Sequence, residues 1–235
     1  KVPYRDDAED PDALTATARE TGARLVYLAN PDNPMGSWHS GRRIAAMLDD
    51  LPDGCLLVLD EAYAEFAPED AIPKIDPEDS RTIRFRTFSK AYAMAGARIG
   101  YGIGPAELIA GFDRIRNHFG INRIAQAGAL AALADQGWLT HIRAEVARAR
   151  TRIAAIAAEN GLTALPSATN FVAIDCGRDG AYARAVLDGL AGQGIFARMP
   201  GTAPMDRCIR VSCGPAAALD AFAAALPPAL GAARE

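Results

Sequence analysis

The fold class is decided by residues 24–60, which read RLVYLANPDNPMGSWHSGRRIAAMLDDLPDGCLLVLD. Two nearly continuous apolar runs, residues 24–29 and 55–60, are typical of strands buried on both faces of a parallel sheet. Residues 40–51 between them have the pattern of a helix, with Ser40 as a suitable N-cap. Strand, helix and strand at this spacing make a βαβ unit, so the sequence predicts an α/β fold with a mostly parallel central sheet.

Further elements follow toward the C-terminus. The alternating run at residues 82–88 and the short apolar run at 99–103 predict two more strands. Alanine-rich helices are predicted at 105–117, 122–135 and 138–160, the last ended by Gly161. Beyond them we expect strands at 171–175, 194–197 and 208–213, and helices near 182–190 and from Ala216. The pattern therefore predicts a large domain over residues 1–140 and a small α+β domain over residues 141–235.

The composition supports a packed core and excludes several functions. Of the 235 residues 50% are hydrophobic, and the net charge of -4 with no long basic run argues against nucleic-acid binding. No apolar run approaches the roughly 20 residues that cross a bilayer, so we expect no membrane association. The three histidines lie far apart in sequence, which gives a metal site no support. Four scattered cysteines suit free thiols in the cytoplasm.

Four segments place polar residues at turns or strand ends. Residues 30–36, NPDNPMG, follow the first strand, where α/β proteins bind ligands, although a tight loop explains them equally well. Asp60 closes an apolar strand, where a carboxylate caps a helix, pairs with a cation or faces a ligand. Lys90 ends the run TFSK and is either a solvated lysine or a reactive amine. Arg210 stands inside the apolar run CIRVSCG and is costly to bury unless an anion meets it.

Considered together, these segments carry a specific resemblance. The sequence contains NPDNPMG, DEAYAEF, RTFSKAYAMAGARIGY, SATNFVAID and CIRVSCG, in that order. With this order and spacing it resembles the fold-type I pyridoxal-phosphate (PLP) aminotransferases of class I/II, and most closely their histidinol-phosphate aminotransferase-like branch. The resemblance covers essentially the whole chain. It implies a PLP-dependent transferase-like large domain, and a sequence that corresponds to the C-terminal two-thirds of the family's chains.

The resemblance assigns cofactor-binding roles to residues at the strand ends. Lys90 would bind PLP covalently and move a proton during catalysis. Asp60 would hold the protonated pyridine nitrogen through a charge-assisted hydrogen bond. Asn33 and Tyr63 would donate to the phenolic oxygen beside the covalent link.

Anion binding is assigned to a second set of residues. Ser89 and Arg98 would bind the phosphate of PLP, for which a hydroxyl and a fork-shaped cation are suited. Arg210 stands where aminotransferases of this fold bind the anionic group of the substrate. Arg198 matches an arginine that the branch uses near the substrate phosphate, with a plain surface position as the alternative. Asn170 aligns with an asparagine beside the substrate, and strand-end hydrogen bonding explains it equally well.

The sequence departs from the family pattern at several points. Met35 stands where most members have threonine, so the hydroxyl contact of that side chain is absent. The glycine loop that cradles the phosphate, the aromatic ring that stacks on the pyridine and the tyrosine-bearing segment that subunits exchange are not in this sequence.

The resemblance implies an aminotransferase. Its amino donor would be an amino acid or an amino-alcohol phosphate, either histidinol-phosphate-like or aromatic, and its acceptor a 2-oxo acid such as 2-oxoglutarate. A homodimer is expected on the same ground. The alternatives are a PLP-dependent decarboxylase of the same fold and an aminotransferase-like effector domain of a transcription regulator. A nicotinamide-dependent dehydrogenase is a weak alternative, because the glycine pattern that starts at Gly102 has Glu107 in place of its third glycine.

Overall fold

The computed structural model describes residues 1–233 and divides into two compact units. Residues 1–32 and 38–142 form the first unit, and residues 33–37 and 143–235 are grouped in the second. The turn segment 33–37 therefore belongs with residues that follow it by more than a hundred positions.

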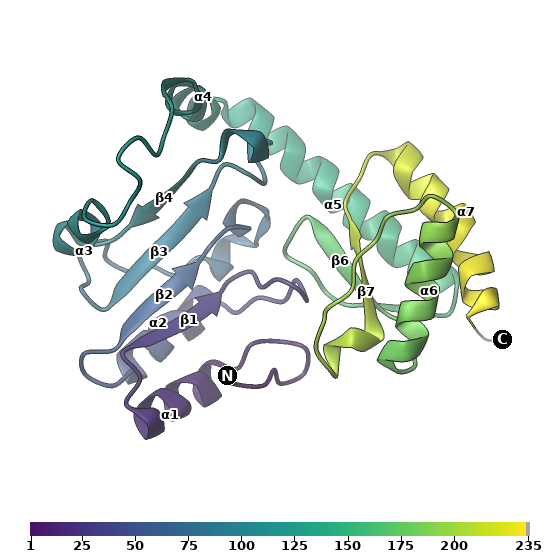
Figure 1. Cartoon of the computed structure of the whole chain (residues 1–235), viewed down its shortest axis with the longest axis horizontal. Coiled ribbons are helices and arrows are strands. Elements are labelled where there is room, and N and C mark those ends of the chain that lie inside the picture. The colour runs from purple at the N-terminus through teal and green to yellow at the C-terminus, as the bar shows by residue number, and fades with distance from the viewer. Residues whose placement is uncertain (234–235) are drawn as a thin grey trace. The chain divides into compact units, whose positions relative to one another are not determined.

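The first unit is built on a sheet with the strand order β1-β2-β3-β4 (Figure 1). The strands are β1 (Leu25–Ala29), β2 (Leu56–Asp60), β3 (Thr82–Thr87) and β4 (Gly100–Ile103). β1 pairs with β2 and β2 with β3 in parallel, whereas β3 and β4 are antiparallel. The predicted α/β class with a mostly parallel sheet is confirmed.

The two faces of this sheet differ in what covers them. On one face Val26, Leu28, Leu57 and Leu59 are buried against helices α1 (Pro11–Thr21) and α2 (Gly41–Asp50). On the opposite, open face of β1, Leu25 and Tyr27 are 63% and 53% exposed. Side chains alternate between the faces of a strand, so Leu56, Val58 and Asp60 of β2 share the open face with them.

Both helices begin at recognisable caps. Ser40 caps α2 as the sequence predicts, and its hydroxyl accepts from the backbone N–H of Arg43 at 3.3 Å. α1 was not predicted, although its signal is present: Asp10 accepts from two backbone N–H groups and Pro11 occupies the first helical turn. Short 3-10 turns follow along the chain at Ala64–Phe66 (η1), Glu69–Ala71 (η2) and Ala95–Ala97 (η3).

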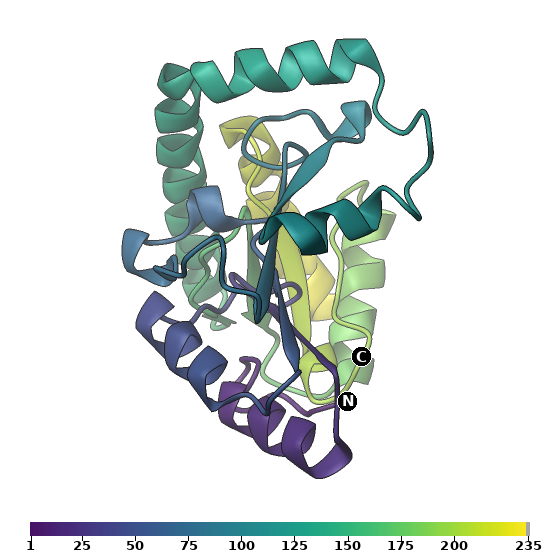
Figure 2. The same cartoon turned by 90° about the vertical axis from the view of Figure 1, so that its left-hand side faces the viewer.

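The helical part of the first unit is shorter than predicted. Helix α3 spans Ala106–Phe112 rather than residues 105–117, and α4 spans Arg123–Ala134. The Asn117 side chain accepts from the N–H of Phe119 at 3.1 Å, a local bond that competes with helical pairing. Figure 2 shows the resulting loop between α3 and α4 reaching away from the sheet.

The second unit has a small antiparallel sheet in the order β5-β6-β7. Its strands are β5 (Thr163–Ala164), β6 (Phe171–Asp175) and β7 (Cys208–Ser212). Its helices are α6 (Gly180–Gly192), α7 (Ala216–Ala232) and the part of α5 (Gln136–Glu159) that follows residue 142, with a 3-10 turn η4 at Met205–Arg207. Buried residues of all three helices pack with β6 and β7 in one core.

One predicted strand is wrong. Residues 194–197 form no strand, and the pairing there is a single bridge between Arg198 and Arg210. Gly194 has a φ of +78°, which extended strands do not use, and Phe196 is 82% exposed. The apolar run therefore marks a loop that touches β7 at one point only.

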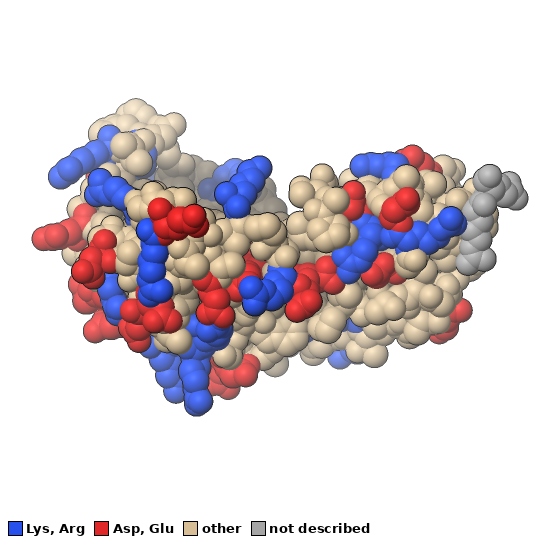
Figure 3. All heavy atoms as spheres, turned by 90° about the horizontal axis from the view of Figure 1, so that it is seen from below, with Lys and Arg blue, Asp and Glu red and all other residues tan. Residues whose placement is uncertain are grey.

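Two observations concern the distribution of surface charge and the character of the helices. Figure 3 shows acidic and basic side chains interspersed over the face that it views, in keeping with the small net charge of -4. Within residues 1–233, no helix combines the length and the apolar character needed to cross a membrane.

Candidate active site

Lys90 lies in the loop that leads from β3 to β4, and its neighbours hold that loop in place. Phe88 and Tyr92 are buried, and their rings pack with 5.1 Å between centroids. The indole Nε1 of Trp138 donates to the carbonyl of Ala91 at 3.0 Å. Since the residues on both sides are anchored, the half-buried Lys90 extends its amine from a fixed stretch of backbone.

The amine of Lys90 lies over the ring of Tyr63, with Nζ 5.1 Å from the ring centroid. A cation at this distance from an aromatic face is attracted by the ring quadrupole. Tyr63 is buried and follows the end of β2 by three residues. The structure thus brings together two predicted site residues from different segments, the turn after β2 and the loop after β3.

Asp60 ends β2 on the open face of the sheet and accepts two hydrogen bonds. Its Oδ2 accepts from the phenol of Tyr27 at 2.6 Å, and its Oδ1 accepts from the backbone N–H of Ala62 at 2.9 Å. Both donors are neutral, so neither of them brings a positive charge to the carboxylate. The bond from Ala62 closes a turn at the strand end, so the simple alternative of an α-helix cap does not apply to Asp60.

Glu61, the next residue, points to the covered side and was not predicted as a key residue. It is 1% exposed, and its two carboxylate oxygens accept from Arg84 Nη2 at 2.7 Å and from Arg86 Nε at 2.9 Å. Burial alone would lower the pKa of the Arg86 guanidinium, but the charge of Glu61 and the hydrogen bond to it raise that pKa. The alternation of arginines in β3 was the available signal, but their partner depends on strand register.

The predicted phosphate-binding residues, Ser89 and Arg98, lie on either side of η3. The N–H of Ser89 donates to Thr87 Oγ1 at 3.1 Å. Arg98 is exposed, has a φ of +53° and donates from Nη1 to the carbonyl of Ala95 at 2.9 Å. A left-handed conformation at a residue with a side chain costs on the order of 1–3 kcal/mol and clusters at functional sites.

A second acidic group near the end of β1 was missed. Oε2 of Glu9 accepts from the N–H of Ala29 at 2.8 Å, and Asp32 Oδ1 accepts from the phenol of Tyr4 at 2.7 Å. Burial of Glu9 raises the pKa of its carboxyl to about 7, although the bond from Ala29 lowers it, and the charges of Asp32 and Asp60 raise it further. Nothing in the order of these residues along the chain signals that their side chains share one sheet edge.

The turn NPDNPMG contains two asparagines with different tasks. Asn30, in the first unit, is 1% exposed, donates to the carbonyl of Ala71 at 2.9 Å and accepts from the N–H of His39 at 2.8 Å. Asn33, grouped with the second unit, is exposed, and its Oδ1 accepts from Arg210 Nη1. The tight-loop interpretation therefore explains Asn30. Asn33 instead has an exposed side-chain amide, whose N–H groups can donate to a ligand.

Two other residues of this turn are constrained by packing. Met35 is 1% exposed, so it fills buried space where most family members have a threonine. Gly36 has a φ of +82°, and a Cβ there would lie 2.5 Å from Ser167 Oγ. Only glycine fits this position without a shift of the neighbouring chain.

The predicted substrate residues all belong to the second unit. The guanidinium carbon of Arg210 lies 4.5 Å from the ring centroid of Phe171, and Arg210 and Arg198 exchange backbone hydrogen bonds of 2.6 and 3.1 Å. Arg198 itself is exposed, with its guanidinium 5.8 Å from the ring of Phe196. The carbonyl of Asn170 accepts from the N–H of Cys213 at 2.8 Å, which is the strand-end bonding expected as its alternative.

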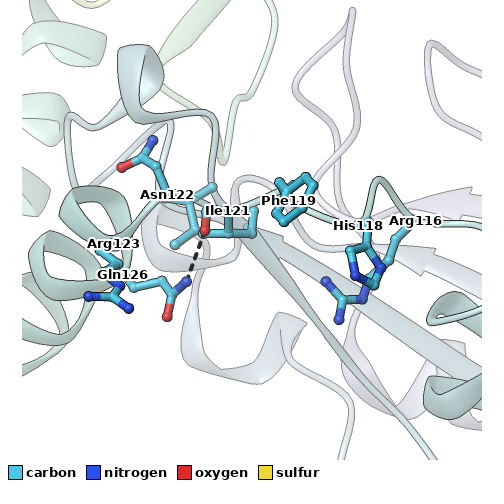
Figure 4. A pocket seen from close by; sticks show the side chains of 10 residues that line it. Arg116, His118, Phe119, Ile121, Asn122, Arg123 and Gln126 are labelled. Atoms are coloured by element: carbon cyan, nitrogen blue, oxygen red, sulfur yellow. Dashed lines mark hydrogen bonds between the residues drawn. The ribbon is translucent and has the colours of Figure 1, made fainter.

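A separate pocket of about 650 Å³ lies beside the loop between α3 and α4. Figure 4 shows Arg116 and His118 close together at one end of it and Arg123 and Gln126 at the other. The Gln126 amide donates to the carbonyl of Ile121 at 3.0 Å. None of the predicted site residues lines this pocket, so it is distinct from the strand ends where the candidate site lies.

Fold and site together define an α/β protein with a primary amine, a phenol and a carboxylate at the carboxyl edge of a mostly parallel sheet. The family model for aminotransferase class I and II matches residues 1–226, and the chain belongs to this family. The chain is 39% identical over 232 residues to histidinol-phosphate aminotransferase 1 of Mesorhizobium japonicum, covering 96% of the chain and 62% of that relative.

A solved structure and a further relative are also similar to this chain. The crystal structure of histidinol-phosphate aminotransferase from Sinorhizobium meliloti, in complex with pyridoxal-5'-phosphate, superimposes with a TM-score of 0.95 at 55% identity, covering 98% of this chain and 64% of that one. An aromatic amino acid aminotransferase of Mycobacterium avium is 31% identical over 223 residues, with 91% of this chain and 62% of that relative covered. The chain thus spans about three fifths of the length of these relatives.

Proposed function

We propose that the protein is a PLP-dependent aminotransferase. It would move an amino group between a histidinol-phosphate-like or aromatic amino donor and a 2-oxo acid such as 2-oxoglutarate. The names of its relatives support this activity, as does the PLP complex of the Sinorhizobium enzyme. The observation that carries the proposal is the Lys90 amine over Tyr63, on the sheet edge where Asp60 ends β2.

The donor set of this edge fits PLP. PLP needs a primary amine for its covalent attachment, and the chain contains only three lysines: Lys1, Lys74 and Lys90. Lys1 and Lys74 are exposed, whereas Lys90 is half-buried against an aromatic ring. The ring nitrogen of PLP needs an anion, and Asp60 is a carboxylate whose bonded donors are both neutral.

PLP, when bound, supplies an electron-accepting ring that stabilises negative charge at the α-carbon of the donor. Once the amino donor has displaced it from PLP, Lys90 Nζ would take the proton from that α-carbon and deliver it to the cofactor carbon that carries the transferred nitrogen. Asp60 would keep the ring nitrogen protonated, and Tyr63 and Asn33 would donate to the phenolic oxygen. Ser89 and Arg98 would bind the phosphate.

Substrate recognition is proposed for the second unit. Arg210 would bind the carboxylate or phosphate of the donor, and Asn33 is one acceptor that its guanidinium contacts in this structure. Arg198 and Asn170 would lie near the same anion. The Arg210 guanidinium bonds to the neutral amide oxygen of Asn33. A carboxylate or phosphate oxygen of the substrate would form a stronger, charge-assisted bond and could replace that contact.

Absorption spectroscopy and product analysis test this function. The full-length protein with PLP is expected to show a visible band that an amino donor bleaches and a 2-oxo acid restores. Release of carbon dioxide from a phosphorylated amino acid, without transfer to 2-oxoglutarate, would instead support the decarboxylase. A protein that binds PLP and DNA but turns over no donor would support the regulator.

Three further properties belong to this proposal. We propose that residues 1–140 form the large cofactor-binding domain and residues 141–235 the small domain. A homodimer is supported by exposed apolar side chains between α3 and the start of α5, where Ile115, Phe119 and Ile124 are each more than 80% exposed. A cytoplasmic location is supported by four cysteines that are all free thiols.

A further inference from the structure

The bond between Tyr27 and Asp60 joins neighbouring strands on the open face of the first sheet. The Cα partner of Asp60 in β1 is Ala29, and Tyr27 lies two residues earlier on the same face. The phenol therefore reaches diagonally across the strand pair, and its oxygen lies 2.6 Å from Asp60 Oδ2. This is the length of a strong hydrogen bond from a hydroxyl to a carboxylate.

The bond fixes the direction in which the carboxylate points. Oδ1 of Asp60 is held by the backbone N–H of Ala62 and Oδ2 by Tyr27, so both oxygens are anchored and rotation of the group is restricted. Each carboxylate oxygen can accept a further bond, which leaves capacity for a ligand. The strands themselves do not need this bond, because β1 and β2 are already paired over residues 25–29 and 56–60.

The phenol is a donor over the whole neutral pH range. Burial of its hydroxyl end, the hydrogen bond to Asp60 and the charge of Asp60 raise the pKa of Tyr27 above its ordinary value, and the charges of Glu9 and Asp32 act in the same direction. Tyr27 as a residue is 53% exposed and does not belong to the buried core, so removal of its hydroxyl leaves no cavity in that core. The substitution Tyr27→Phe therefore removes the hydrogen bond without disturbing the core.

We propose that Tyr27 is a positioning residue, which holds the Asp60 carboxylate in the orientation that binds the ring nitrogen of PLP. The inference rests on the proposed function, because it concerns the same cofactor. Tyr27 acts through Asp60 and does not itself touch the reacting atoms.

The chain offers a matched control in Tyr4. Its phenol donates to Asp32 Oδ1 at 2.7 Å, so Tyr4→Phe removes the same chemical bond from the same unit. Asp32 has no proposed role toward PLP. A general effect of losing a phenol–carboxylate bond would appear in both variants, whereas a positioning effect on Asp60 appears only in Tyr27→Phe.

The test is a double-mutant cycle in the full-length protein, with Tyr27→Phe, Asp60→Ala and both together, beside Tyr4→Phe. The readouts are the dissociation constant of PLP, the pH dependence of the visible band, and kcat and KM for the donor. We expect Tyr27→Phe to weaken PLP binding and lower kcat by about 10-fold each, with KM changed less than about 3-fold. Tyr4→Phe should change each quantity less than about 3-fold, and Tyr27→Phe should add less than about 2-fold to Asp60→Ala.

Two results would overturn the inference, and both differ from failure of the proposed function. Equal effects of Tyr27→Phe and Tyr4→Phe, or full additivity with Asp60→Ala, would show that Tyr27 does not act through Asp60. Thermal unfolding without PLP, measured on every variant, identifies any loss that comes from folding. A wild-type protein that forms no visible band with PLP would instead refute the proposed function itself.

Discussion

At the end of β2, two adjacent carboxylates lie on opposite sides of the sheet, one among cationic side chains and the other among neutral hydrogen-bond donors. Glu61, on the covered side, is buried between Arg84 and Arg86. Asp60, on the open side, meets a phenol and a backbone N–H. The charge of Glu61 is matched by cations of the chain, whereas the two bonds to Asp60 orient its charge without neutralising it. The comparison separates a carboxylate that holds the fold from one that is available to a cationic ligand.

The distinction extends to the arginines. Arg84 and Arg86 both bind the carboxylate of Glu61, which ties β3 to the turn after β2. In the second unit Arg210 contacts an amide oxygen of Asn33 and the ring of Phe171. Contacts with an amide and a ring are more readily exchanged for a substrate anion than a buried ion pair is. Substitutions on each side of this division should therefore differ in whether they reduce stability or turnover.

Glu61→Ala should cause the largest loss of stability. It leaves two largely buried guanidinium groups without their shared carboxylate, and breaking such a pair costs about 3–5 kcal/mol. Urea unfolding of the purified protein measures the free energy. The control is Asp60→Ala on the open side, for which we expect a loss below about 1 kcal/mol. Equal losses of unfolding free energy in the two variants would show that the carboxylates on the two sides do not differ in their contribution to the fold.

Asp60→Ala should have the opposite profile and damage turnover. The protonated ring nitrogen would lose its anion, and removal of one such preorganised electrostatic contact lowers kcat by about 100- to 1000-fold. Covalent attachment of PLP to Lys90 should persist, because it does not involve Asp60. Single-turnover absorption with an amino donor measures the rate of proton removal. An unchanged rate would contradict the role of Asp60.

Glu9→Gln should change how stability depends on pH. The folded protein raises the pKa of Glu9 from 4.5 to about 7, so between these values the folded state retains a proton that the unfolded state has released. Stability therefore falls as pH rises through this window, and above pH 7 the ionised Glu9 costs about 3 kcal/mol. The difference in unfolding free energy between variant and wild type should grow from pH 4.5 to 7 in favour of Gln.

The control for this experiment is Glu20→Gln, which changes an exposed glutamate at the end of α1. It should leave the pH profile of the wild type in place. A Glu9→Gln profile that runs parallel to the wild-type profile from pH 4 to 8 would show that Glu9 is not perturbed.

Arg210→Lys should have the smallest of these effects and should act on the substrate. Lysine keeps the charge but loses the two-pronged geometry of the guanidinium, so we expect KM for the donor to rise about 10-fold. The absorption spectrum and affinity of bound PLP should change little. Steady-state kinetics with a panel of donors, beside PLP titration, measures both. Equal damage to PLP binding would place Arg210 in the cofactor site instead.

The sequence predicted the sheet of the first unit because apolar runs and a capped helix occur there in the spacing of a βαβ unit. It failed at residues 194–197, where an apolar run ends in a loop with an exposed Phe196. α1 was missed, although Asp10 and Pro11 form a clear start signal. Local patterns predicted the strands of the buried sheet, but they do not show which apolar segments are held in place by a single contact only.

The candidate site was predictable only in part. Lys90, Asp60 and Tyr63 could be named because strand ends and motif order point to them. The ion pairs of Glu61 and the bond from Tyr27 to Asp60 could not be named, since both depend on strand register rather than on sequence spacing. The raised pKa of Glu9 likewise follows from burial beside Asp32 and Asp60, which no local pattern encodes.

The most direct test of the account is to locate the covalent link to PLP. The full-length protein is incubated with PLP, reduced with borohydride and digested, and the modified lysine is identified by mass spectrometry. We predict a stable adduct on Lys90, none on Lys74, and no adduct at all in Lys90→Ala. An adduct on Lys74 at the same yield, or one that persists elsewhere in Lys90→Ala, would contradict the central claim that Lys90 is the catalytic amine.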